Sequence, residues 1–247
     1  MKKILKAKWL PSLILVILFL LWNGFQTKGF FTVSSFRYLN ILVPLACIAI
    51  GVTVTVICGG IDLSTGALVC VVNCTFVVLQ ERGMGMPQAM VLALLISVAV
   101  GVVNGFFVAV VRINPLLVTF AMQTICTGLA LWILPNAGGK GSEGFTKWYS
   151  FGTLAGIPTS IVFFVILPLL LWYFMKKTPM GSWLYATGKD ERKAFESGIN
   201  TVAVQFFAYI FSAFMTGWAA IAFSGNIVGG DPKAGLSFTM NAVAAAV

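Results

Sequence analysis

The residues best suited to chemistry in this sequence lie in the stretch GGIDLSTG, residues 59–66, which interrupts a long apolar run. Asp62 is the only acidic residue among the first 80, and the hydroxyl side chains of Ser64 and Thr65 follow it closely. A carboxylate inside an apolar stretch is costly unless it has partners or a function. The stretch therefore calls for a structural or a functional explanation.

Two explanations fit these residues. The glycines are expected to end one helix, and Asp62 to cap the next by accepting from the N–H of Ser64 or Thr65. A helix broken inside a membrane also exposes backbone and polar side chains to a substrate pathway in transporters. Capping is the simpler explanation, and both can hold. The candidate pathway residues are Asp62, Ser64 and Thr65, with three buried amides that need partners: Asn73, Asn104 and Gln123.

The segment TGKDERKAFESGIN is the most hydrophilic part of the chain. Thr187 or Gly188 is expected to cap a helix of about nine residues, roughly 13 Å long, that ends before Gly198. A solvated connector and a docking helix for a cytoplasmic partner explain this segment equally well from the residues alone. The candidate docking residues are Gly188, Asp190, Glu191, Ala194, Phe195 and Gly198.

Several classes of site find no support in the sequence. The absence of histidine excludes histidine general bases, HExxH zinc sites and haem ligation through imidazole. No Walker A loop and no nucleic-acid-reading motif occurs. Cys70 and Cys74 share a helix face, which leaves a metal or disulfide pair as the alternative to buried free thiols. We expect no enzyme activity, no metal, no cofactor and no nucleic-acid partner.

The composition is that of an integral membrane protein. Of the 247 residues 59% are hydrophobic and 9% are charged, whereas a soluble domain carries about a quarter charged residues. A spanning helix needs about 20 mostly apolar residues. We predict an all-α, polytopic transmembrane helical bundle, one domain over 1–247, with about seven spans and the start of another near the C-terminus. The predicted spans are 9–25, 39–58, 61–79, 88–111, 116–134, 157–175 and 201–223, and the third reaches spanning length only if GGIDLSTG belongs to it.

The basic residues favour one orientation in the membrane. The net charge is +9, and a cytoplasmic N-terminus places ten Lys and Arg residues inside and six outside. This orientation makes the loop 176–200 cytoplasmic and the glycine-rich loop 136–156 external. Gly101 and Gly105 form a GxxxG pattern, which is expected to let two helices approach closely.

Four segments together resemble one protein family. They are GGIDLSTG, GVVNGFFVAVVRINPLLVTFAMQTICTGLALWI, TPMGSWLYATGKDERKAFESGIN and GGDPKAGLSFTMNAVAAAV. Their order is that of bacterial ABC importer permeases for monosaccharides of the ribose/xylose/galactose class, which also includes autoinducer-2 permeases. The resemblance covers about residues 40–247.

This resemblance implies a helical permease in the bacterial inner membrane. Its implied partners are a cytoplasmic ABC ATPase, a periplasmic sugar-binding protein, a second permease subunit and membrane lipid. It favours the docking reading of TGKDERKAFESGIN, although the usual Asn-Glu-x-Ala-Ala core is only partly kept here. It places GGIDLSTG near the translocation path. Family members normally continue beyond the segment at Val247, so we expect the chain to be C-terminally incomplete.

Two alternatives stay open at this stage. An ion-coupled secondary carrier would need a titratable group in its pathway, and Asp62 is the candidate. A truncated permease that does not transport is the second alternative.

Overall fold

The computed structural model describes residues 10–27, 30, 37–154 and 157–246. Almost every element is helical, and the two short strands pair antiparallel with Thr153 opposite Pro158. The elements are α1 (Leu10–Gln26), 3-10 helix η1 (Arg37–Ile41), α3 (Val43–Ile57), α4 (Thr65–Glu81), α5 (Met86–Gly105), π-helix η2 (Phe106–Val110), α6 (Pro115–Ile133), α7 (Glu143–Phe151), β1 (Thr153–Leu154), β2 (Ile157–Pro158), α8 (Thr159–Lys177), α9 (Pro179–Lys189), α10 (Glu191–Glu196), α11 (Thr201–Ile227) and α12 (Leu236–Ala246).

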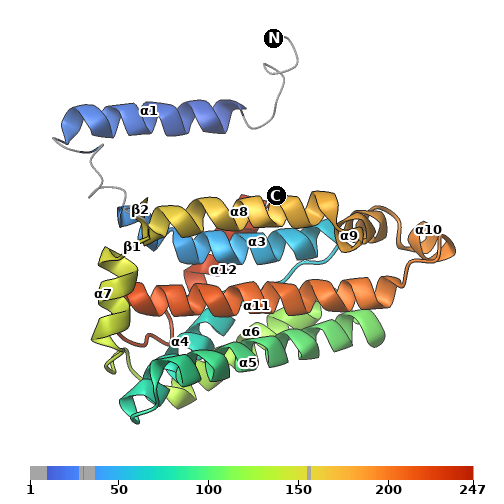
Figure 1. The fold of residues 1–247 in the computed structure, drawn as a ribbon. Coiled ribbons are helices and arrows are strands. Elements are labelled where there is room, and N and C mark those ends of the chain that lie inside the picture. Colours follow the sequence, from blue (N-terminus) through green and yellow to red (C-terminus); the bar gives the residue numbers. More distant parts are fainter. Residues whose placement is uncertain (1–9, 28–29, 31–36, 155–156, 247) are drawn as a thin grey trace.

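The long helices form one bundle around α11, which confirms the all-α polytopic prediction. Helix α11 packs against α3, α5 and α4, and α4 is covered by α6, α5 and α12. In Figure 1, α7 lies across one end of the bundle, while α9 and α10 lie at the opposite end. Helix α1 stands apart from the bundle with its apolar side chains exposed. The bundle therefore has two distinct ends that soluble partners can reach.

Within the described residues, four helices are long and apolar enough to cross a membrane, or five if the bent pair α8–α9 counts as one span. The predicted number of about seven is not reached, because α1, α4 and α12 are apolar but shorter than 18 residues. The predicted start of the first span at Trp9 lies outside the described residues. The α8–α9 bend of 77° follows from Thr178, which is extended because Pro179 disfavours a helical conformation before it.

Residues 61–64 of the predicted third span, 61–79, do not belong to its helix. Helix α4 begins at Thr65, and the residues from Gly60 to Ser64 are not helical. Gly59 has φ +88°, the left-handed conformation that ends α3 and that glycine adopts without strain. Most of α4 is buried inside the bundle, so its short length does not have to match the bilayer thickness.

Two predictions about loops also need correction. The predicted helix capped at Thr187 or Gly188 is two helices, because α9 continues to Lys189 and Asp190 caps the six-residue α10. The loop 136–156 contains α7, which Ser142 caps by accepting from the Phe145 N–H at 3.3 Å. Helix α7 and the α9–α10 pair lie at opposite ends of the bundle (Figure 1).

Candidate functional site

The carboxylate of Asp62 lies at the centre of a buried polar cluster. Its Oδ1 accepts from the Ser64 N–H at 3.0 Å and from the Ser64 hydroxyl at 2.6 Å. Its Oδ2 accepts from the Ser212 hydroxyl at 2.9 Å. Asp62 is only 2% exposed, and no Lys or Arg pairs with it in the described part of the chain. Neutral hydroxyl and amide donors alone hold this carboxylate. We call Asp62, Ser64, Asn104, Tyr209 and Ser212 the Asp62 cluster.

Three helices hold the break between α3 and α4 in place. From α5, Asn104 Nδ2 donates to Ser64 Oγ at 3.0 Å, and from α6, Thr119 Oγ1 donates to the Ile61 carbonyl at 3.2 Å. From α11, Ser212 binds Asp62, and the Tyr209 hydroxyl lies where a Cβ on residue 60 would be. Only glycine fits at position 60 without displacing that ring. The break is therefore a defined structure and not a slack loop.

Three polar atoms beside the break make no hydrogen bond within the described residues. They are the Thr65 hydroxyl, the Asn104 Oδ1 and the Tyr209 hydroxyl, and all are buried. Buried polar atoms in folded proteins are almost always paired, with protein, water or ligand. Their concentration around the helix break gives this region unused capacity to bind a polar molecule.

The other two predicted amides lie outside this cluster. Asn73 joins α4 to the α11–α12 connection: its Nδ2 donates to Ser224 Oγ at 2.7 Å, and its Oδ1 accepts from the Asp231 N–H at 2.8 Å. Gln123 is half-buried on α6, and its side chain makes no hydrogen bond to any described residue. Asn73 therefore has a structural role in this chain, whereas Gln123 is free to bind something else.

The two glycines of the GxxxG pattern face α11. A Cβ on Gly101 would lie 2.6 Å from the Ala213 Cβ, and a Cβ on Gly105 would lie 3.0 Å from the Phe206 ring. These distances are too short for ordinary contacts, so α5 approaches α11 as closely as it does because both residues lack a side chain.

The cysteines and acidic residues do not form a metal or redox centre in the described residues. All five cysteines are buried free thiols, so Cys70 and Cys74 are not bonded to each other. No group of three His, Cys, Asp or Glu side chains lies close enough to hold a metal ion within the described ranges.

Sequence reasoning missed a cleft with three charged residues in its lining at the α7 end of the bundle. Two glycine-rich segments, residues 137–141 and 227–231, pair through Gly138 and Gly230 and enclose about 460 Å³. Lys140, Glu143 and Asp231 line this cleft. The glycine-rich composition of both segments was the signal, but their pairing joins residues about 90 positions apart and has no local signature in the sequence.

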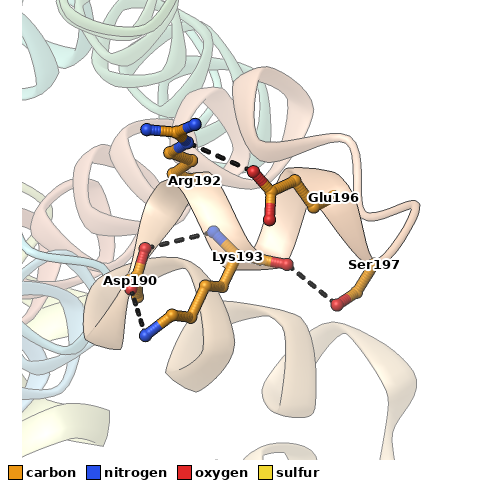
Figure 2. Close-up of polar contacts among 5 residues, drawn as sticks. All are labelled: Asp190, Arg192, Lys193, Glu196 and Ser197. Carbon is orange, nitrogen blue, oxygen red and sulfur yellow. Dashed lines mark hydrogen bonds and ion pairs between the residues drawn. The ribbon is translucent and has the colours of Figure 1, made fainter.

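At the opposite end, α10 is a short helix with its own network of charges (Figure 2). Asp190 accepts from the Lys193 N–H at 3.1 Å and pairs with its ammonium group at 3.1 Å. The hydrogen bond from the Lys193 backbone N–H is the main reason why the pKa of Asp190 is lowered. Arg192 pairs with Glu196 at 3.1 Å. This network stiffens a helix that is otherwise too short to be stable.

The predicted docking residues differ in whether their side chains are exposed or buried. Phe195 is 70% exposed and protrudes from α10, whereas Ala194 is buried against the protein. Gly198 has φ +85°, as its position after the helix requires. A Cβ on Gly188 would collide with the Ile57 carbonyl, so α9 rests directly on the end of α3. The α9–α10 end therefore touches α3, the helix that leads into the break.

Glu191 has contacts within the protein instead of facing solvent alone. It forms an ion pair with Arg112 and accepts from the Thr201 hydroxyl at 3.2 Å. The hydrogen bond from Arg112 is the main reason why the pKa of Glu191 is lowered.

Comparison with known proteins agrees with this architecture. A family model described as "Branched-chain amino acid transport system / permease component" matches residues 34–247. The galactofuranose transporter permease protein YtfT of Escherichia coli strain K12 is 29% identical over 96% of this chain and 73% of its own length.

Two further relatives are also permease proteins of import systems. The ribose import permease protein RbsC of Escherichia coli strain K12 is 27% identical over 96% of this chain and 75% of its own length. The autoinducer 2 import system permease protein LsrD of Salmonella paratyphi B is 28% identical over 82% of this chain and 63% of its own length. No solved structure gives a significant match.

Proposed function

The chain belongs to the family of transport-system permease components, and on this premise we propose that it is the membrane subunit of an ATP-driven importer for a monosaccharide. The observation that carries the proposal is the similarity, over 96% of the chain, to permeases for galactofuranose and for ribose. The apolar bundle with two accessible ends agrees with a multi-pass protein of the bacterial inner membrane. ATP hydrolysis belongs to a separate ATPase subunit.

The two ends of the bundle take different partners in this proposal. The α9–α10 end faces the cytoplasm, as does the N-terminus, and binds the ATPase through the exposed side of α10. The α7 end faces the periplasm, where the cleft of Lys140, Glu143 and Asp231 receives a sugar-binding protein. A second permease subunit completes the membrane assembly. The excess of basic residues on the α9–α10 side supports this orientation.

The sugar pathway passes beside the break between α3 and α4 in this proposal. The support is chemical: sugars are recognised through their hydroxyl groups, and the unpaired polar atoms of Thr65, Asn104 and Tyr209 are concentrated there. Asp62 and Ser64 keep the break in shape through their own hydrogen bonds. Gln123, with an unengaged amide, is the candidate on α6 for direct contact with the sugar.

The proposal is tested by reconstituting the permease with its ATPase and its binding protein in liposomes. Uptake of radiolabelled ribose, xylose, galactose and galactofuranose is measured with ATP inside, and with an ATPase variant that binds ATP without hydrolysing it as the control. We expect uptake of at least one sugar that disappears with the variant. Uptake driven by a proton or sodium gradient without ATP would instead support the ion-coupled carrier and overturn the proposal.

A further inference from the structure

Glu191 connects three parts of the protein at the cytoplasmic end. It lies in the first turn of α10, its Oε1 pairs with the guanidinium group of Arg112, and the same atom accepts from the Thr201 hydroxyl at 3.2 Å. Arg112 lies in the corner between η2 and α6, and Thr201 begins α11. One carboxylate therefore joins the docking helix to the ends of two long helices.

This ion pair differs from the others in the described residues. The pairs Arg192–Glu196 and Lys193–Asp190 link neighbours three or four positions apart, and so does Lys147–Glu143. Arg112 and Glu191 are 79 positions apart in the sequence. Short-range pairs stabilise only their own helix, whereas this one connects separate elements.

The backbone of Arg112 gives a second, independent observation. Its φ is +66°, in the left-handed region that favours glycine. Among the described residues, Val228 with φ +59° is the other non-glycine residue in this region, and glycines occupy the remaining four positions: Gly59, Gly83, Gly139 and Gly198. At this corner, glycine would satisfy the backbone better, yet the residue is an arginine whose side chain pairs with Glu191. Glycine at position 112 would remove the backbone strain, so the presence of arginine there indicates that its side chain has a function.

Helix α11, which Glu191 contacts at Thr201, and helix α6, which begins just after the corner of Arg112, also hold the helix break. Thr119, about one turn after the start of α6, binds the Ile61 carbonyl, and Ser212 on α11 binds Asp62. Ser212 lies about 16 Å along α11 from Thr201, at 1.5 Å per residue. A movement of α10 that Glu191 passes to α6 and α11 therefore reaches both sides of the break through rigid helices.

We propose that Arg112 and Glu191 are positioning residues that make α10 move together with α6 and α11, and so couple ATP hydrolysis to the opening of the sugar pathway. This inference rests on the proposed function. It assigns Glu191 a role inside the permease, while the exposed side of α10, with Phe195, contacts the ATPase. Coupling of this kind requires a continuous set of contacts between the two sites, which these residues supply.

The test uses the reconstituted importer with the same four sugars. Arg112→Gly removes the guanidinium group and relieves the backbone, so it is not expected to impair folding. Glu191→Gln removes the negative charge with little change of shape, and Arg112→Lys keeps the positive charge. Arg82→Ala is the matched control, because it removes an exposed arginine at the end of α4 that forms no ion pair within the described residues and lies outside α10.

Three quantities are measured: co-purification of the ATPase, ATP hydrolysis, and sugar uptake. For Arg112→Gly and Glu191→Gln we expect normal co-purification and continued ATP hydrolysis, with uptake lower by about tenfold, a typical coupling between two sites. More ATP is then consumed for each sugar transported. The double variant should be no worse than either single variant, since both remove the same interaction. Arg112→Lys should recover much of the uptake.

The other outcomes are equally informative. Normal uptake in Arg112→Gly, additive losses in the double variant, or an equal loss in Arg82→Ala would overturn the coupling role. Loss of ATPase co-purification in Glu191→Gln would overturn it as well, because Glu191 would then be a docking residue. Absence of ATP-driven uptake in the unmodified importer would overturn the proposed function itself, which is a distinguishable result.

Discussion

The Oδ2 atom of Asp62 accepts a hydrogen bond from the Ser212 hydroxyl at 2.9 Å, which ties the break between α3 and α4 to the middle of α11. Both residues are buried, and the remaining carboxylate oxygen is satisfied by Ser64. A buried carboxylate without a cationic partner depends on such neutral donors for its stability. Loss of one donor therefore has a cost that can be measured.

Replacing Ser212 with alanine is expected to destabilise the protein by about 1–3 kcal/mol, because one oxygen of Asp62 is left without a partner. Thermal unfolding of the purified protein in detergent measures this change. Ser237→Ala is the control, since Ser237 is exposed on α12 and surface substitutions usually change stability by less than about 0.5 kcal/mol. An unchanged unfolding temperature with lost sugar uptake would show instead that Ser212 and Asp62 act on the substrate directly.

Two glycine-to-alanine substitutions in helices should have opposite effects. In Gly101→Ala the new methyl group would lie 2.6 Å from the Ala213 Cβ, so α5 and α11 must separate, at about 1–3 kcal/mol. In Gly128→Ala nothing lies within 4 Å of the new group, so the higher helix propensity should stabilise α6 by up to about 1 kcal/mol. Thermal unfolding compares the two variants, and a similar effect of both would contradict the close packing at Gly101.

The hydrophobic pattern predicted the long helices, and the glycines with Asp62 predicted the break between α3 and α4. The predicted span 116–134 is α6, Pro115–Ile133, and the predicted span 157–175 is α8, Thr159–Lys177. Both are apolar runs bounded by proline or basic residues, which are local signals. The contacts of Tyr209 and Ser212 with the residues before α4 could not be predicted, because these partners lie more than 140 positions away in the sequence.

The candidate site was predictable in part for the same reason. Asp62 and Ser64 stand out as polar residues in an apolar stretch, and the predicted bond from the Ser64 N–H to Asp62 is present. Their partner Ser212 lies in a long apolar helix with no local feature to single it out. The Arg112–Glu191 pair joins segments 79 positions apart, and pairing over such a distance has no signature in one sequence. Patterns of neighbouring residues predict helix caps and turns, but they do not predict contacts between helices that are distant in the sequence.

Helix α10 should lose its structure only in strongly acidic solution. The pKa of Asp190 is lowered from 3.8, first by the hydrogen bond from the Lys193 N–H, and that of Glu191 from 4.5, first by the bond from Arg112. A carboxylate whose pKa is lower in the folded state stabilises it above the unfolded pKa, and this contribution is lost as the pH falls through the folded pKa. Amide exchange of residues 191–198, expressed relative to the intrinsic exchange rate at each pH, should therefore stay slow at about pH 5 and accelerate below about pH 4.

Asp190→Asn provides the control for this pH dependence. Asparagine caps helices as well as aspartate does but does not titrate. Exchange in the variant should be similar to that of the original protein at about pH 5 and should depend less on pH below it. The same acceleration in both proteins would show that the acid sensitivity of α10 comes from elsewhere.

Gln123→Ala should reduce sugar uptake without a large change of stability. The Gln123 side chain is half-buried and makes no hydrogen bond to any described residue, so its removal costs the folded protein little. The comparison variant is Asn73→Ala, which removes three hydrogen bonds and should lower the unfolding temperature as well as the yield. Unchanged transport kinetics in Gln123→Ala would remove this residue from the pathway.

Phe195→Ala should weaken binding of the ATPase by about tenfold, since large aromatic side chains are common among the residues that dominate interfaces. Phe195 is 70% exposed, so its truncation should leave the unfolding temperature of the permease alone unchanged. Titration of the reconstituted permease with labelled ATPase gives the dissociation constant. Trp132→Ala is the matched control, because Trp132 is 81% exposed but lies at the end of α6 far from Arg112 and α10. Equal weakening by both substitutions would mean that general hydrophobic contact, and not the α10 surface, holds the ATPase.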